Sequence, residues 1–400
     1  MTDKCVREPE RDIPVIGEYD VVVVGGGIAG AAAAIAAARE GASTCLIEKE
    51  NALGGLATLG LVEVYLPLCD GKGRQVIGGL AEELLLNSIK YGPGKVPECW
   101  ADKNGDIEAR IKQRYRLTFN PASFIISLEE RVLEAGVQLM YDTRVCNVLL
   151  KEGRIEAIMV ENKSGRLALR AKNVVDASGD ADVCFLAGEK TASLNTNRRA
   201  GWFIANVDGR VETQHMTDPL RKDPPPGART YAGDDWKDVT ALNIDSRKMT
   251  MEWIDRLRQD RGYDRVYPLV LPSIPSFRMT RRLVGAFELD EADDKRFFSD
   301  AIGMTGDWRK PGPVFYIPYR SLVAVRTKNL IAAGRCISVT TSAWDITRAI
   351  PTCALTGEAA GVAAGVSART CQQLSELDVH DLQGRLREYG AIIDIPDKPN

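Results

Sequence analysis

Three glycines and one glutamate near the start of the chain have the residue types and the spacing of a binding site for an anionic dinucleotide. Gly25, Gly27 and Gly30 satisfy the pattern G-x-G-x-x-G, and Glu48 follows eighteen residues after the last glycine. Bare backbone at such glycines lets N–H groups approach a pyrophosphate, while the carboxylate accepts hydrogen bonds from a ribose diol. A glycine-rich turn that holds no ligand is the alternative, and the flanking segments argue against it.

The flanking segments are the elements that such a site needs. Residues 20 to 24, DVVVV, are typical of a strand buried on both faces. We expect the first glycine to allow the tight turn, the second to leave room for phosphate, and the third to let the next helix pack closely. The alanine-rich stretch 31 to 38 favours that helix, whose N-terminus carries partial positive charge. A second strand in residues 43 to 50 then delivers the glutamate.

Composition excludes several other kinds of site. A net charge of −3 gives no attraction to nucleic acid or to an anionic membrane surface. The nine cysteines are scattered and never spaced C-x-x-C, which is typical of reduced thiols in a cytoplasmic protein and offers no zinc site. With only His215 and His380 available, we expect no metal centre. We also expect no secretory signal and no membrane span, because no apolar segment is long enough. A homo-oligomer stays open.

The glycine loop alone does not distinguish an NAD site from an FAD site, and further segments of the chain are needed to do so. They are a paired-glycine segment at 51 to 61, a β-meander in 136 to 162, the strand end NVVDASGDADV at 173 to 183, NLIAAGRCIS at 329 to 338, and a small-residue helix at 348 to 367. With R-R-L-V-G and Y-I-P-Y-R, they make the chain resemble the bacterial FAD-dependent oxidoreductases of the glutathione-reductase-like flavoprotein superfamily. The likeness runs from Asp20 to about Asp394.

The resemblance implies FAD as cofactor and names the residues that contact it. The glycine loop would hold the pyrophosphate, the acidic strand end the ribose, and the last helix the flavin N1–C2=O edge. The implied cofactor residues are Gly25, Gly27, Ile28, Ala29, Gly30, Glu48, Lys49, Gly55, Leu56, Ala57, Thr58, Val145, Ala177, Ser178, Gly179, Gly334, Arg335, Ile350 and Thr352. Because no histidine precedes residue 215, we expect FAD to be held without a covalent bond.

The resemblance also implies an α/β fold in which one domain interrupts another. We expect a Rossmann-like FAD-binding domain with a β-meander, its first part in residues 1–190, including a flavin-covering segment at about 60–110. An α+β substrate domain is expected as an insert at 191–324. Residues 325–400 would complete the FAD-binding domain and add a C-terminal helix, started by Asp378.

A connecting helix in the first part of the chain has a clear start and stop. Asn120 suits the N-cap, Pro121 the first helical position, and Gly136 the end. We therefore expect the helix to fill the stretch between Pro121 and Gly136.

Candidate catalytic residues must face the flavin, and arginines are prominent among them. We expect Arg278, Arg281, Tyr319 and Arg348 to act on the substrate, because guanidinium groups suit a carboxylate or an enolate-like oxygen. At least one arginine among Arg278, Arg281, Arg282, Arg320 and Arg348 should present its guanidinium to the pocket. Salt bridges are the alternative for each arginine, and a core position is the alternative for Tyr319.

The leading hypothesis for function is hydride transfer between a small organic substrate and flavin N5. Oxygen, a quinone or a carrier protein would be the electron acceptor, since a second G-x-G-x-x-G for a nicotinamide is absent and residues 54 to 68 contain no cysteine for a disulfide reductase. Flavin monooxygenation is the first alternative, although the second signature of such hydroxylases is not evident. A non-catalytic FAD-holding assembly protein is the second. The stretch GDWRKPGPVFYIPYR lacks the histidine that relatives often carry there, which suggests a different substrate.

Overall fold

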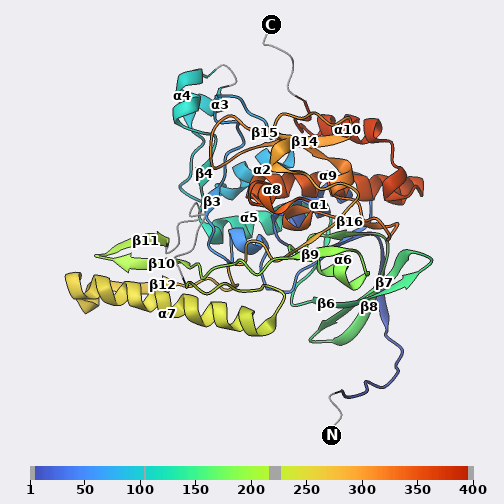
Figure 1. Ribbon diagram of the computed structural model, residues 1–400, viewed down its shortest axis with the longest axis horizontal. Coiled ribbons are helices and arrows are strands. Elements are labelled where there is room, and N and C mark those ends of the chain that lie inside the picture. The colour runs from blue at the N-terminus through green and yellow to red at the C-terminus, as the bar shows by residue number, and fades with distance from the viewer. Residues whose placement is uncertain (1–4, 103–104, 216–226, 395–400) are drawn as a thin grey trace.

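A mixed sheet of seven strands forms the centre of the computed structural model, which describes residues 5–102, 105–215 and 227–394 (Figure 1). Its strands are β1 (Val15–Val24), β2 (Thr44–Ile47), β5 (Gln138–Met140), β6 (Arg144–Lys151), β7 (Arg154–Asn162), β8 (Gly165–Asp176) and β16 (Leu330–Ala332). They lie in the order β5-β2-β1-β8-β7-β6, and β16 pairs with β8 as well. The Rossmann-like α/β fold is therefore confirmed.

The long strand β8 joins a parallel half of the sheet to an antiparallel half. Its last residues pair in parallel with both β1 and β16, while its first residues pair with β7 in the meander β6-β7-β8. The meander turns at Gly153, whose φ of +75° favours glycine. Residues 138 to 140, expected within the meander, instead extend the parallel half as β5 beside β2. The intervening helix α5 (Pro121–Glu134) supplies the crossover that a parallel pairing requires.

Two helices rich in small residues pack against each other over this sheet. Helix α1 (Ile28–Arg39) is buried over most of its length, and α9 (Ile350–Thr370) is buried almost entirely. A methyl group built on Gly357 of α9 would lie 2.2 Å from the carbonyl oxygen of Ala29, and one on Gly361 would lie 2.2 Å from that of Ala33. The small residues of α9 therefore serve mainly to let the two helix backbones approach.

The segment between β2 and α5 contributes to the same core. Its elements are β3 (Val64–Tyr65), α2 (Leu80–Ser88), α3 (Glu98–Ala101), α4 (Ile107–Lys112) and β4 (Leu117–Thr118). Helix α2 packs against α9 and α5, and Tyr65 and Leu84 belong to the main hydrophobic cluster. Much of the segment at 60 to 110 thus packs into the main hydrophobic core.

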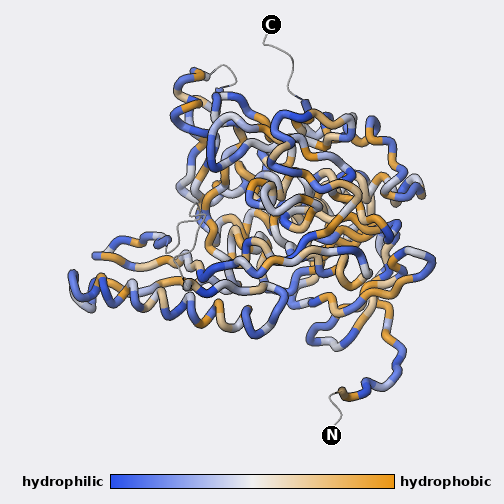
Figure 2. The backbone as a smooth tube through the Cα atoms, viewed as in Figure 1, coloured by the Kyte–Doolittle hydropathy of each residue, from blue (hydrophilic) through white to orange (hydrophobic). Residues whose placement is uncertain are grey.

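The inserted segment divides into an arm and a part that merges with the body. Its elements are β9 (Thr191–Ser193), β10 (Trp202–Val207), β11 (Arg210–His215), α7 (Trp236–Arg261), β12 (Val266–Val270), β13 (Arg281–Leu283), β14 (Ala301–Gly306) and β15 (Val314–Pro318). The sheet β11-β10-β12 and α7 project from the body (Figure 1) around a small core of their own. Hydrophilic and hydrophobic residues alternate along α7 (Figure 2), as expected of an amphipathic helix. Strands β14 and β15 instead join the main core.

Two short helices follow strands of the central sheet: α6 (Asp182–Leu186) comes after β8, and α8 (Thr341–Thr347) comes after β16. In the last part of the chain, α10 (Val379–Glu388) lies at the outside of the molecule (Figure 1). No single helix within the described ranges is long and apolar enough to cross a membrane, whereas α8 and α9 meet that criterion only as a pair bent by 90°.

Candidate functional site

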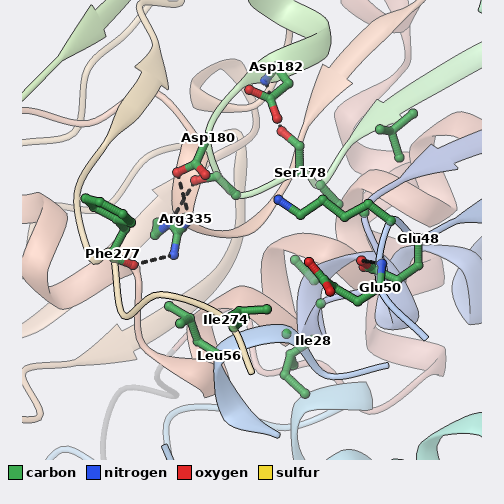
Figure 3. A pocket seen from close by; sticks show the side chains of 18 of the residues that line it. Ile28, Glu48, Glu50, Leu56, Ser178, Asp180, Asp182, Ile274, Phe277 and Arg335 are labelled. Carbon is green, nitrogen blue, oxygen red and sulfur yellow. Dashed lines mark hydrogen bonds and ion pairs between the residues drawn. The ribbon is translucent and has the colours of Figure 1, made fainter. Parts of the chain in front are cut away.

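A cavity of about 530 Å³ opens at the carboxyl ends of the parallel strands. Val24 and Ile47 from the ends of β1 and β2, and Ala177 and Ala333 just after β8 and β16, form its floor. This is the edge at which open α/β sheets bind ligands, and the volume is ordinary for a small-molecule site. Figure 3 shows how side chains from several segments converge on it.

The glycine loop forms one wall, and each of its three glycines has a separate structural reason. Gly25 ends β1 with a φ of +100°, and a methyl group there would lie 2.5 Å from the carbonyl oxygen of Ala177. A methyl group on Gly30 would lie 1.7 Å from the carbonyl oxygen of Gly25, so only glycine lets α1 begin so close to the loop. Gly27, the N-cap of α1, would direct a methyl group into open space in the cavity. The bare face of Gly27 and the helix N-terminus fit a pyrophosphate.

Glu48 lies at the end of β2 and connects two parts of the wall. Its Oε2 accepts a hydrogen bond from the N–H of Gly26 at 2.6 Å, and its Oε1 accepts one from the N–H of Glu50 at 2.8 Å. Burial raises the pKa of Glu48, and these two N–H donors oppose the shift. A carboxylate has about four lone-pair directions. Two acceptor positions therefore remain on the carboxylate of Glu48, which lines this side of the cavity (Figure 3).

The strand end DASGDAD forms the wall directly beside the glycine loop. Ala177, Ser178 and Gly179 line the cavity. Asp182 pairs with Arg281 at 2.6 Å. Burial and the nearby carboxylates of Asp180 and Asp176 together raise the pKa of Asp182 to about 6. The residues that follow β8 thus bring both small residues and acidic side chains to the cavity.

Arg335 fastens this wall to the inserted segment. Its Nη2 donates to Asp180 at 2.7 Å, its Nε donates to the carbonyl oxygen of Gly179 at 2.7 Å, and its Nη1 donates to that of Phe277 at 2.8 Å. Figure 3 shows Arg335 between Asp180 and Phe277, on the side of the cavity away from Glu48. The arginine is therefore held by the protein on both sides.

The start of α9 and the paired-glycine segment also line the cavity. Ile350 and Cys353 in the first turn of α9 line it, as does Arg348 just before the helix. Gly55 and Leu56 line it from a short 3-10 turn (Gly55–Ala57). A helix N-terminus at this point provides partial positive charge for an anionic edge of a ligand.

The inserted segment supplies the remaining wall. Gly233, Val239, Ile274, Pro275, Phe277 and Arg278 line the cavity from this part of the chain. Figure 3 places Ile274 next to Leu56 of the paired-glycine segment. The insert therefore covers the cavity opposite the dinucleotide-binding elements.

Four of the five candidate arginines are neutralised by carboxylates. The pairs are Arg281 with Asp182, Arg282 with Glu288, Arg320 with Asp300, and Arg348 with Asp345. Arg278 lines the cavity and forms no ion pair within the described part of the chain. Burial, together with the charges of Arg348 and Arg335, lowers the pKa of Arg278 to about 9, and the charge of Asp345 opposes the shift. Arg278 is thus the one of these five arginines that lines the cavity without an ion pair among the described residues, and its role toward a substrate stays a prediction.

Most of the residues named from sequence come together at this cavity. Those that line it are Gly25, Gly27, Ile28, Ala29, Glu48, Lys49, Gly55, Leu56, Ala57, Val145, Ala177, Ser178, Gly179, Arg278, Arg281, Arg335, Arg348 and Ile350. Their individual contacts with a cofactor or substrate stay predictions.

Five named residues lie behind the walls. Thr58 donates to the carbonyl oxygen of Leu53, Thr352 bonds to Thr305, and Gly334 donates its N–H to Thr356. Gly30 serves helix packing, as its position next to Gly25 shows. These four residues support the walls of the cavity, and any contact of theirs with a cofactor stays a prediction.

Tyr319 is the fifth of these, and its position corrects the expectation that it acts on the substrate. The chain leaves β15 at Pro318 and enters a 3-10 turn that sends the ring into the main core. There the hydroxyl donates to the carbonyl oxygen of Leu374 at 2.8 Å. We do not retain Tyr319 as a catalytic candidate.

Sequence reasoning missed several residues that the structure brings to the site. Phe277 directly precedes Arg278 and Ile274 lies four positions before it, so nearness to Arg278 in the sequence is the only available signal. Cys353 lies in the P-T-C segment of α9 and was not singled out. Asn197 carries no sequence signal, yet its Oδ1 accepts hydrogen bonds from the N–H groups of Arg278 and Met279.

Comparison with known proteins agrees with this geometry. The family model described as FAD dependent oxidoreductase matches residues 20–201 and 189–386. Protein FixC of Escherichia coli O157:H7 is 29% identical over 167 residues, which are 40% of this chain and 36% of FixC. An uncharacterized protein from the nifH2 5′ region of Methanosarcina barkeri is 28% identical over 196 residues, 47% of this chain and 96% of that protein. The match thus spans only about a third of the length of FixC.

A solved structure has a similar fold over nearly the whole chain. The p-nitrophenol 4-monooxygenase PnpA of Pseudomonas putida DLL-E4 superposes with a TM-score of 0.51, covering 94% of this chain and 87% of PnpA at 14% identity. At that identity the likeness concerns the fold alone.

Proposed function

The chain belongs to the FAD dependent oxidoreductase family, and we propose that it transfers a hydride between a small organic substrate and N5 of a non-covalently held FAD. Family membership makes FAD the cofactor and makes the chain an oxidoreductase, which sets aside the assembly-protein alternative. One observation carries the finer proposal. The dinucleotide-binding elements form one side of a single cavity, and the inserted segment, with Arg278, forms the other.

The residues present fit FAD at the adenosine and pyrophosphate end. Open space at Gly27 and the N-terminus of α1 would receive the pyrophosphate, and the two free acceptor positions on Glu48 would receive the ribose diol. Val145 would contact the adenine from the meander. When bound, FAD supplies a hydride acceptor or donor at N5.

The residues at the other end would orient the reacting partners. The N-terminus of α9 favours negative charge at the nearest edge of the cofactor, which raises its reduction potential. Ile274 and Phe277 provide apolar cover that excludes water from the space between cofactor and substrate. Arg281 and Arg348 are held by Asp182 and Asp345, so in this proposal they fix the shape of the cavity.

The electron acceptor in this proposal is oxygen, a quinone or a carrier protein. The chain has one G-x-G-x-x-G, and the cavity assigns it to FAD, which leaves no second loop of this kind for a nicotinamide. We also propose a division into an FAD-binding domain at 1–190 and 325–400 and a substrate domain at 191–324, supported by the separate small core of the arm. A cytoplasmic location is supported by the nine free thiols.

Anaerobic reduction of the bound FAD tests the proposed reaction. Purified protein would be exposed without oxygen to a panel of metabolites that can lose a hydride, and the long-wavelength absorption band of the oxidised flavin would be followed. We expect at least one organic substrate to bleach this band in a saturable manner. Bleaching only by nicotinamides would contradict the proposal and favour monooxygenation.

A further inference from the structure

The backbone next to Arg278 is fixed on both sides. Asn197 is almost fully buried, and its Oδ1 accepts hydrogen bonds from the N–H groups of Arg278 at 2.8 Å and Met279 at 3.0 Å. Its Nδ2 donates to the carbonyl oxygen of Met279 at 2.8 Å. Before Arg278, the carbonyl oxygen of Phe277 accepts from Arg335. The backbone that carries Arg278 in the cavity wall is therefore held by hydrogen bonds on both sides.

No carboxylate within the described residues forms an ion pair with Arg278, and Asp345, whose charge raises the pKa of Arg278, is already paired with Arg348. Arg335 and Arg348 are near enough to lower its pKa, but each of these has its own carboxylate, Asp180 and Asp345. With a pKa of about 9 the group stays mainly protonated at neutral pH. Arg278 is partly buried, and a partly buried charge without an ion pair is unfavourable, so a bound anion would relieve this cost.

The parts of FAD that carry negative charge have other partners. The pyrophosphate would lie at the glycine loop, and the flavin edge would lie at the N-terminus of α9. Arg278 follows Phe277, which lies across the cavity from Glu48 (Figure 3), and it comes from the inserted segment. It therefore faces the space that remains for a substrate.

We propose that Arg278 anchors the carboxylate of the substrate through a two-pronged ion pair, and that Asn197 is the positioning residue for it. This inference rests on the proposed function, because it assumes that a substrate binds beside FAD. The planar guanidinium presents parallel N–H donors that match a carboxylate. Arg281 and Arg348 cannot take this role without giving up their own carboxylates.

Titration of the holoprotein with simple carboxylates tests the inference. Benzoate and succinate are the probes, benzamide and succinamide are their neutral counterparts, and the absorption spectrum of bound FAD reports binding. We expect the wild type to bind a carboxylate saturably and Arg278→Met to bind it roughly tenfold to a hundredfold more weakly, as for loss of hydrogen bonds to a charged group. Arg278→Lys should recover part of the affinity. FAD content should not change.

Two further variants separate anchoring from general effects. Arg170→Met removes a positive charge from a surface pair with Glu18 and should leave carboxylate affinity unchanged. Asn197→Ala should weaken carboxylate binding in the wild-type background but not in the Arg278→Met background, because its effect passes through Arg278. An equal loss in both backgrounds would overturn the positioning role.

The outcomes distinguish this inference from the proposed function. Carboxylates that bind Arg278→Met as tightly as wild type, or that never perturb the flavin of an FAD-loaded protein, would overturn the anchoring role alone. Loss of FAD from Arg278→Met would assign the arginine to the cofactor and also overturn it. A wild-type chain that cannot bind FAD would instead remove the proposed function.

Discussion

A methyl group built on Gly30 would lie 1.7 Å from the carbonyl oxygen of Gly25, far inside any real contact. The two glycines therefore touch, and the first turn of α1 rests directly on the turn that ends β1. Gly27, between them, has nothing within 4 Å of the same added atom. One motif thus contains glycines required by the fold and a glycine that leaves space for a ligand.

This contrast predicts different results for Gly30→Ala and Gly27→Ala. Gly30→Ala should lower the thermal unfolding midpoint of the FAD-free protein, since overpacking costs about 1–3 kcal/mol or more. Gly27→Ala should keep the midpoint but weaken FAD binding by roughly tenfold or more, because the methyl group occupies the space for the pyrophosphate. Calorimetry of the apoprotein and fluorescence titration with FAD would measure both. Wild-type FAD affinity in Gly27→Ala would mean that the pyrophosphate lies elsewhere.

Glu48→Arg should abolish FAD retention during purification. The ribose diol loses its acceptor, and a hydrogen bond to a charged group is worth about 1.5–3 kcal/mol, or roughly tenfold to a hundredfold in affinity. Glu48→Gln keeps one carbonyl acceptor and should show a smaller loss. Because Glu48 also holds Gly26 and Glu50, the unfolding midpoint of each apoprotein should be measured beside FAD affinity. Unchanged FAD occupancy in both variants would show that the ribose binds elsewhere.

NADH and NADPH should be poor direct reductants of the bound FAD. The only G-x-G-x-x-G of the chain lines the cavity assigned to FAD. Stopped-flow mixing under anaerobic conditions should show slow bleaching that depends linearly on nicotinamide concentration. Fast bleaching that saturates with either nicotinamide would reveal a dedicated site and would support the monooxygenase alternative.

Glu358 should make stability fall as pH rises through the neutral range. Its Oε2 accepts from the N–H of Leu80, and its Oε1 has no hydrogen-bond partner among the described residues. Burial raises the pKa of Glu358 from 4.5 to about 8, so the folded chain holds a proton that the unfolded chain releases between these values. The stabilisation is complete below the lower value and is lost as pH rises through the upper one.

Glu358→Gln checks this dependence, since glutamine stays neutral at every pH. Its free energy of unfolding should exceed that of the wild type at alkaline pH, by an amount on the order of a few kcal/mol, and should match it below a pH of 4.5, the ordinary pKa of the group. Thermal unfolding across a pH series would measure the difference. If the stability of the two proteins changed with pH in the same way, the proton taken up on folding would belong to a group other than Glu358.

Local sequence signals predicted the dinucleotide elements well. The glycine spacing located α1 and its approach to β1, and Asn120 indeed caps α5 by accepting from the N–H of Ser123. Asp378 likewise caps α10. These features depend on residues within a few positions of each other, so pattern and capping rules suffice.

The state of the arginines could not be read from the sequence in the same way. Arg281 pairs with Asp182, and Arg335 pairs with Asp180, across separations of more than ninety residues. Whether a guanidinium is paired thus depends on how distant segments meet. Tyr319 turned into the core because the chain changes direction right after β15, which the motif Y-I-P-Y-R does not encode locally.

The cofactor released by the unfolded protein tests the central claim most directly. The purified chain would be precipitated by heat or acid, and the flavin in the supernatant would be identified and quantified by chromatography against FAD and FMN. We predict FAD in the supernatant, close to one per chain, because the glycine loop and Glu48 bind the half of the molecule that FMN lacks. A colourless protein that cannot take up FAD, or flavin that stays with the precipitated chain, would contradict non-covalent FAD binding at this site.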